Sequence, residues 1–182
     1  ILFFNLMRII SGIFKGRTFS PPERSSVRPT TDMAKEGLFN ILQHRSVLEG
    51  ITVIDLFAGT GSISYEFVSR GAEIAFSVEK DEVMIDFIKS VSIKLNIKNI
   101  KPVRNDVYKF LTLTSIKADI IFADPPYNAI GIADIPDIVF DKNLLNEDGL
   151  LIIEHDSHIN FSSNPHFFEE RKYGKVHFSF FK

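Results

Sequence analysis

The sequence predicts an α/β fold in which helices cover both faces of a mostly parallel seven-stranded sheet that closes with an antiparallel C-terminal strand. Beyond residue 45, short apolar runs alternate with helical patterns, as they do in sheets with helices on their faces. Most of these runs are almost continuously apolar, which is typical of parallel strands buried on both sides. With 182 residues, 45% of them hydrophobic and 24% charged, the chain can build one substantial core.

The individual elements follow from length and periodicity. The apolar strand candidates are residues 51–57, 73–79, 100–104, 118–123 and 149–154. The helix candidates are residues 31–45, 62–70, 81–96 and 106–113. Two aromatic-rich runs, 166–171 and 175–181, are joined by a connection too short for a parallel return, so they should form an antiparallel pair. We expect residues 1–45 to form an extension, a β-hairpin plus a helix, and residues 46–182 to form the main domain.

Several classes of protein are disfavoured by composition. The chain has no cysteine, which excludes disulfides and thiolate-bound metals, and no set of residues suggests any other metal site. No run approaches the roughly 18 apolar residues of a membrane span. The apolar residues before Met7 lack a basic leader, so we do not interpret them as a signal peptide, and Met7 is a candidate start. We expect a cytoplasmic monomer.

Charge is unevenly distributed along the chain. The net charge is −2, but the first 45 residues carry +4, which leaves −6 for the remainder. A basic arm of this kind can contact nucleic-acid phosphates, although a solvated surface segment would have the same composition. The basic and polar candidates for such contacts are Arg8, Lys15, Arg17, Arg24, Arg28 and Thr30.

A glycine-containing loop, residues 55–61 (DLFAGTG), connects the first apolar strand to a predicted helix. Glycine lets a ligand approach the backbone closely, and the following helix presents free N–H groups. The dinucleotide fingerprint is incomplete, because Ser64 occupies the position of its third glycine. Asp55 would suit a cofactor with a positive ammonium group better than a pyrophosphate. The alternative is a tight turn without a ligand.

Acidic residues also follow the next two strands. Glu79 ends the second strand 18 residues after Gly61, where a carboxylate can accept hydrogen bonds from ribose hydroxyls. A solvated strand-end glutamate is the alternative interpretation. Asp106 follows the third strand and could accept from an adenine amino group, although a helix-capping aspartate would look the same.

The tetrapeptide Asp124-Pro125-Pro126-Tyr127 directly follows the fourth strand. Hydrogen bonds from an aromatic amino group to the Asp124 side chain and the Pro125 carbonyl would direct its lone pair toward a sulfonium methyl. Pro126 restricts the backbone of Pro125, and Tyr127 could stack on the base. A rigid turn with a surface tyrosine is the alternative. If the strand order reverses between the first and fourth strands, both loops meet at one switch point.

Together these motifs resemble the RsmD family of bacterial methyltransferases, which modify a guanine N2 of 16S ribosomal RNA. The matching segments span most of the chain: MRIISGIFKGRTF at 7–19, RPTTD and KEGLFNIL within 28–42, DLFAGTGSI at 55–63, VEKD at 78–81, ND at 105–106, DPPY at 124–127 and YGKVHFSFF at 173–181. The resemblance implies a class I methyltransferase fold and S-adenosylmethionine as cofactor. It also implies 16S ribosomal RNA as partner, within an assembled or assembling small subunit.

The resemblance assigns roles to the motif residues. The cofactor would contact Asp55, Phe57, Gly59, Gly61, Glu79, Lys80, Asp106 and Val107. The target base would lie against Asp124, Pro125, Pro126 and Tyr127, and Arg28 and Thr30 would line the substrate side. Residues 128–140 match nothing in the family pattern.

Three other functions share parts of this pattern. An adenine-N6 methyltransferase of RNA or DNA would use the same second loop, although 182 residues leave little room for a DNA-reading domain. A protein glutamine methyltransferase typically begins that loop with asparagine, where this chain has Asp124. A noncatalytic ribosome-assembly factor could retain the fold.

Overall fold

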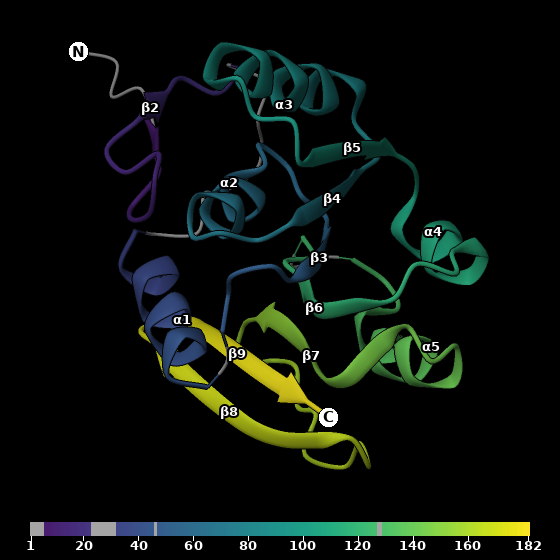
Figure 1. The fold of residues 1–182 in the computed structure, drawn as a ribbon. Helices are drawn as coiled ribbons and strands as arrows, with labels where there is room; N and C mark the ends of the chain where they lie inside the picture. The colour runs from purple at the N-terminus through teal and green to yellow at the C-terminus, as the bar shows by residue number, and fades with distance from the viewer. Residues whose placement is uncertain (1–5, 23–31, 46, 127–128) are drawn as a thin grey trace.

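The computed structural model describes residues 6–22, 32–45, 47–126 and 129–182. Its seven-stranded sheet has the order β5-β4-β3-β6-β7-β9-β8 (Figure 1). The strands are β3 (Thr52–Leu56), β4 (Ile74–Glu79), β5 (Ile100–Arg104), β6 (Ala118–Ala123), β7 (Leu145–His155), β8 (Phe167–Tyr173) and β9 (Val176–Phe181). The helices are α1 (Asp32–Arg45), α2 (Ser62–Ser69), α3 (Glu82–Leu95), α4 (Val107–Leu113), η1 (Ile132–Asp134) and α5 (Ile135–Asp141).

The sheet is parallel from β5 to β7, and β9 runs antiparallel to both of its neighbours. The predicted architecture is therefore confirmed. Two elements differ from the expectation: β7 begins four residues earlier than the apolar run at 149, and α5 is absent from the predicted helices. The early part of β7 contains the polar sequence NEDG, and α5 is a seven-residue helix with Pro136 in its first turn, so neither shows a long periodic pattern.

Alternating residues of the central strands supply two cores, one on each face of the sheet. Val53 packs with α1, α2 and α3, whereas Ile54, the next residue, packs with α4 and α5. Ile152 and Ile153 of β7 divide between the two faces in the same way. Figure 1 accordingly shows α1 and α2 on the opposite side of the sheet from α4 and α5. This double coverage explains why the central strands are apolar.

Among the described residues, no helix is both long and apolar enough to cross a membrane.

The N-terminal segment packs against the first of these cores. Strands β1 (Met7–Arg8) and β2 (Thr18–Phe19) pair antiparallel. Met7, Ile9 and Phe19 are buried in the same cluster as α1 and α2. A boundary between residues 45 and 46 stays a prediction.

A buried carboxylate attaches this segment to α2. Glu66 is fully buried and accepts hydrogen bonds from the backbone N–H groups of Ile10 (2.8 Å) and Ser11 (3.0 Å). Arg70, one turn further along the helix, forms an ion pair with the same side chain at 2.8 Å. Lys35 of α1 lies at 4.0 Å and donates to the Arg8 carbonyl at 2.6 Å. These contacts connect the hairpin, α1 and α2 through one charged group.

Replacing this carboxylate should destabilise the whole chain. Glu66→Ala leaves the cations of Lys35 and Arg70 buried and two backbone donors unsatisfied, which should lower the free energy of unfolding by about 3–5 kcal/mol. Urea denaturation followed by circular dichroism measures this difference. Glu36→Ala, at an exposed position of α1, is the helix-matched control and should change stability by less than about 0.5 kcal/mol. Equal effects of the two substitutions would contradict the anchoring role of Glu66.

Candidate active site

Two loops leave neighbouring parallel strands at the same edge of the sheet. β3 pairs with β6 so that Leu56 lies opposite Ala123, the last residue of β6. The backbone N–H of Asp124 donates to the Leu56 carbonyl at 3.4 Å, which continues the contact past the strand end. Because α2 and α4 cover opposite faces, the strand order reverses here, and such a switch point is where open α/β sheets bind ligands.

The first loop has a tightly turned backbone. Phe57, Gly59 and Gly61 all have positive φ angles, of 59°, 51° and 79°. At Gly61 a Cβ atom would meet the side chains of Tyr65 and Ile88 at 3.0 Å, so glycine is required by both conformation and space. Phe57 is not glycine, and its left-handed conformation costs about 1–3 kcal/mol, a strain that clusters at functional sites. The loop is therefore held in a shape that its sequence alone would not favour.

Asp55 lies beneath this loop and faces the start of α2. Its Oδ2 atom accepts hydrogen bonds from the backbone N–H (3.0 Å) and the hydroxyl (2.6 Å) of Ser64. Burial raises the pKa of Asp55 to about 7, against the opposing effect of the Ser64 hydrogen bonds; the negative charges of Asp124 and Glu79 raise it further. A positive group bound at this sheet edge would offset those charges. Contact between Asp55 and a cofactor ammonium stays a prediction.

Glu79 joins the end of β4 to the first loop. Its Oε2 atom accepts from the Gly59 backbone N–H at 2.9 Å, and its Oε1 atom accepts from those of Lys80 (2.8 Å) and Asp81 (2.9 Å). The side chain is half-buried. A carboxylate offers about four lone-pair sites, so these three bonds leave capacity for a ribose hydroxyl. Glu79 therefore shapes the loop whether or not a ligand is present.

Asp106 and Val107 begin α4, beyond the end of β5. The Asp106 side chain accepts a hydrogen bond from the Lys109 backbone N–H at 3.0 Å, so it caps α4. This is the helix-capping role that the sequence left open as an alternative to adenine binding. Asp106 is exposed, while Val107 is buried in the second core. Capping uses one carboxylate oxygen, and a role toward adenine stays a prediction.

In the second loop the two prolines have different environments. Pro125 is buried and Pro126 is exposed, and the Pro126 carbonyl accepts from the Ala129 N–H at 2.7 Å. Asp124 is half-buried at the strand end. Tyr127 lies outside the described residues.

Tyr108 is a residue of this region that the sequence analysis missed. From the first turn of α4 it donates its hydroxyl to the Ile130 carbonyl at 2.7 Å, and its ring meets that of Phe57 edge-on at 6.3 Å. It thus connects α4 with the first loop, through Phe57, and with the segment that follows the second loop, through Ile130. No local signal marks this role, because its partners lie 22 and 51 positions away in the sequence.

The basic candidates of the arm are only partly described. Arg8 pairs with Asp32 at 3.0 Å on the surface, and Lys15 and Arg17 are exposed around the turn between β1 and β2. Arg24, Arg28 and Thr30 lie outside the described residues. Among the described candidates Arg8, Lys15 and Arg17 are all exposed, and Arg8 is in an ion pair with Asp32; contact with a nucleic acid stays a prediction.

Comparisons with known proteins agree over almost the whole chain. The family model described as "Conserved hypothetical protein 95" matches residues 7–182. Ribosomal RNA small subunit methyltransferase D of Escherichia coli (strain K12) is 32% identical over 149 residues, which cover 81% of this chain and 74% of the relative. The protein of that name from Buchnera aphidicola subsp. Baizongia pistaciae is 29% identical over 179 residues, covering 96% and 91%. The structure of yhhF from Escherichia coli has a TM-score of 0.84 at 27% identity and covers 97% of both chains, which confirms the predicted fold class.

The raised pKa of Asp55 predicts a specific pH dependence of stability. The folded-state pKa, about 7, exceeds the ordinary aspartate value of 3.8, so the native state holds this proton more tightly than the unfolded chain. The stability it contributes is complete below about pH 4 and is lost as the pH rises to about 7. Because asparagine does not titrate, the stability of Asp55→Asn relative to wild type should increase over this range, by up to about 4 kcal/mol, and level off above it.

Urea denaturation of the ligand-free protein at several pH values measures this difference. Asp141→Asn, at an exposed position, is the matched control and should show a pH-independent difference from wild type. A flat profile for Asp55→Asn as well would mean that Asp55 has an ordinary pKa in the folded protein.

Proposed function

The chain belongs to the RsmD family, whose model is described as Conserved hypothetical protein 95, and on that basis we propose that it methylates the exocyclic N2 amino group of a guanine in 16S ribosomal RNA. Family membership makes the chain a methyltransferase. S-adenosylmethionine as methyl donor, the RNA and the guanine are parts of the proposal. The names of the Escherichia coli and Buchnera relatives, which refer to small-subunit ribosomal RNA, support the choice of RNA.

The residues at the sheet edge fit the proposed cofactor. Gly59 and Gly61 have no side chains, and Glu79, which already fixes Gly59 in place, has capacity left for a ribose hydroxyl. The sulfonium and ammonium groups of S-adenosylmethionine are both positive. They would complement the carboxylates that raise the pKa of Asp55. When bound, the cofactor supplies the methyl group.

The second loop would hold the amino group of the base. In the proposed geometry the two guanine N–H groups donate to the Asp124 carboxylate and the Pro125 carbonyl, which directs the nitrogen lone pair at the methyl carbon. The N–C bond forms as the C–S bond breaks, and the cationic nitrogen then loses its proton to water. Burial of Pro125 limits the movement of the carbonyl that must be aimed.

The pairing of β3 with β6 is the observation on which this proposal depends most. Leu56 and Ala123 are opposite one another, so a methyl donor bound at the first loop and an amino group bound at the second would be neighbours. An adenine-N6 methyltransferase would need the same geometry, and no contact of the described residues distinguishes the two bases. A noncatalytic assembly factor would not need the two loops to meet.

The methylated nucleoside identifies the substrate. Purified protein is incubated with radiolabelled S-adenosylmethionine and either small-subunit particles or naked ribosomal RNA from a strain that lacks the gene, and the RNA is then digested. We expect N2-methylguanosine. N6-methyladenosine would replace the guanine assignment, and absence of label in any RNA despite cofactor binding would refute the proposed substrate class.

Substitution of Asp124 should separate chemistry from cofactor binding. Asp124→Ala removes the acceptor that orients the amine, so the single-turnover rate should fall by about 100-fold or more. The dissociation constant for S-adenosylmethionine should change by less than about threefold, because the proposed cofactor contacts are on the first loop, at Glu79 and at the start of α4, and do not include Asp124. Undiminished turnover would exclude this role for Asp124.

Glu79→Ala should show the opposite pattern. Loss of the ribose acceptor should weaken cofactor binding by about tenfold, or about 1.4 kcal/mol, in isothermal titration calorimetry. Glu82→Ala, three residues further along and exposed in an ion pair with Arg104, is the control and should leave the affinity unchanged. If both substitutions had the same effect, the ribose contact would have to be placed elsewhere.

The arm should contribute electrostatically to RNA binding. Lys15→Ala and Arg17→Ala, together, should weaken RNA binding and reduce the slope of log affinity against log salt by about one for each phosphate that the arm no longer neutralises. Lys117→Ala is the matched control, because it removes an exposed cation just before β6, at the opposite edge of the sheet from the two loops. An unchanged slope in the double variant would restore the interpretation of a solvated surface segment.

A further inference from the structure

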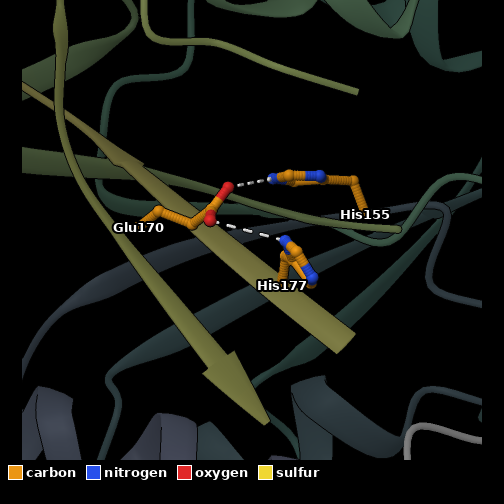
Figure 2. A group of neighbouring side chains, drawn as sticks. All are labelled: His155, Glu170 and His177. Atoms are coloured by element: carbon orange, nitrogen blue, oxygen red, sulfur yellow. Dashed lines mark ion pairs between the residues drawn. The ribbon is translucent and has the colours of Figure 1, made fainter. Parts of the chain in front are cut away.

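Three side chains, one each from β7, β8 and β9, converge on one face of the sheet. His155 ends β7 and lies directly opposite His177 of β9, and Glu170 reaches between them from β8. Figure 2 shows each carboxylate oxygen of Glu170 directed at a different imidazole ring. The distances are 3.8 Å from His155 Nε2 to Oε2 and 3.4 Å from His177 Nδ1 to Oε1.

The cluster is enclosed on most sides. His155 and His177 are 2% and 8% exposed, and the ring of His155 packs edge-on against Phe161 at 5.2 Å. The side chain of Glu170 is 26% exposed and forms the open side. A small ion could therefore enter from solvent, while the two imidazoles are fixed by packing.

The hydrogen bonds of His155 determine which ring nitrogen faces the cluster. Its Nδ1 lies 2.7 Å from the Asp156 backbone carbonyl, which can only accept, so Nδ1 carries the proton of the neutral ring. Nε2 therefore presents its lone pair, accepts from the Ser179 hydroxyl at 2.8 Å and faces a Glu170 oxygen. Nε2 and the Glu170 oxygen are both electron-rich, and a cation between them would interact with both, taking the Nε2 lone pair in place of the Ser179 hydroxyl. A carbonyl behind the distal nitrogen is the usual support for a metal-binding histidine.

The separations also suit an ion better than direct contact. Both Glu170 to histidine distances exceed the 2.7–3.2 Å of ordinary hydrogen bonds. The three candidate ligand atoms all lie within 4.8 Å of one another. In a tetrahedral zinc site, metal–ligand distances of about 2.0–2.2 Å place ligand atoms about 3.4 Å apart. Small inward side-chain movements would reach that spacing.

We propose that His155, Glu170 and His177 form a binding site for one divalent transition-metal ion of the zinc class. Two imidazole nitrogens and one carboxylate suit zinc and its neighbours, whereas magnesium and calcium prefer oxygen ligands alone. The sequence did not predict this metal site, because the ligands are 15 and 7 positions apart in the chain and match no compact motif.

A bound ion would join β7, β8 and β9 at the sheet edge that borders the second loop. Ile153 pairs with Ala123, so β7 leaves its last two residues, Glu154 and His155, beside the start of that loop. The ion would stabilise this edge without contacting the first loop. The proposal is independent of the methyl-transfer reaction.

Substitution of Lys172 tests the site, because it should raise the affinity of the protein for the metal ion. The Lys172 ammonium group lies 3.3 Å from Glu170 Oε1 and is 64% exposed, so it competes for the carboxylate that the ion would use. Lys172→Ala should therefore bind the ion more tightly than wild type. A structural ion-pair network without a metal would give no such increase.

The experiment uses the full chain without an affinity tag, stripped with a chelator. Isothermal titration with Zn²⁺ should give one site per chain, and Co²⁺ should give the intense visible absorption of a tetrahedral complex. Glu170→Gln and His177→Ala should each lose at least about tenfold in affinity. His158→Ala, which removes an 88% exposed surface imidazole, is the matched control and should retain the site.

Thermal unfolding of the metal-free variants checks that they are folded, and added Zn²⁺ should raise the midpoint for wild type and Lys172→Ala only. Absence of a saturable single site in both of these proteins would overturn the proposal. So would equal affinity in wild type, Glu170→Gln and His177→Ala.

Discussion

Parallel pairing of β3 with β6 is the constraint from which the candidate active site follows. Both strands are buried on both faces, so their register is fixed by packing in two cores at once. Since Leu56 is opposite Ala123, the glycine loop and the loop that begins at Asp124 leave the sheet at the same level. Helices α2 and α4 cover opposite faces of the sheet next to this point. The site is a consequence of strand order more than of either loop by itself.

The carboxylates at this sheet edge hold the loops and helix starts in place, and they are also the groups proposed to contact the cofactor. Glu79 fixes Gly59, Asp55 fixes the start of α2 through Ser64, and Asp106 caps α4. Each uses backbone N–H groups, so the positions of these acids and the shape of the loops are set together. Burial raises the pKa of Asp55, and the negative charges of Asp124 and Glu79 raise it further; positive charge on a bound cofactor would offset those charges.

Buried charges also organise the two ends of the chain. For the N-terminal hairpin, Glu66 of α2 accepts hydrogen bonds from backbone N–H groups and forms an ion pair with Arg70, and so it holds the hairpin on α2. At the C-terminal end, Glu170 lies between two imidazoles on the last strands. The first carboxylate is satisfied by close hydrogen bonds, whereas the second is held at longer distances on a partly open surface. That difference in geometry separates a structural anchor from a candidate ion site.

Elements with local signals could be predicted from the sequence. The apolar run at 118–123 matches β6, because strands buried on both faces are apolar throughout and end abruptly at polar residues. Residues 100–104 match β5, which is an edge strand and is only partly buried. The glycine loop and the Asp124-Pro125-Pro126 segment can also be recognised in the sequence, because each motif consists of consecutive residues. Helix α5, which is short and begins with a proline in its first turn, has no such signal.

Which distant residues meet depends on the tertiary structure. Ile10 and Glu66 are 56 positions apart, Tyr108 and Ile130 are 22 apart, and His155 meets His177 only because β7 and β9 pair. Periodicity indicates whether a residue faces a core, but not which residue faces it from another strand or helix. Those contacts depend on strand order and register, which packing of the whole chain selects.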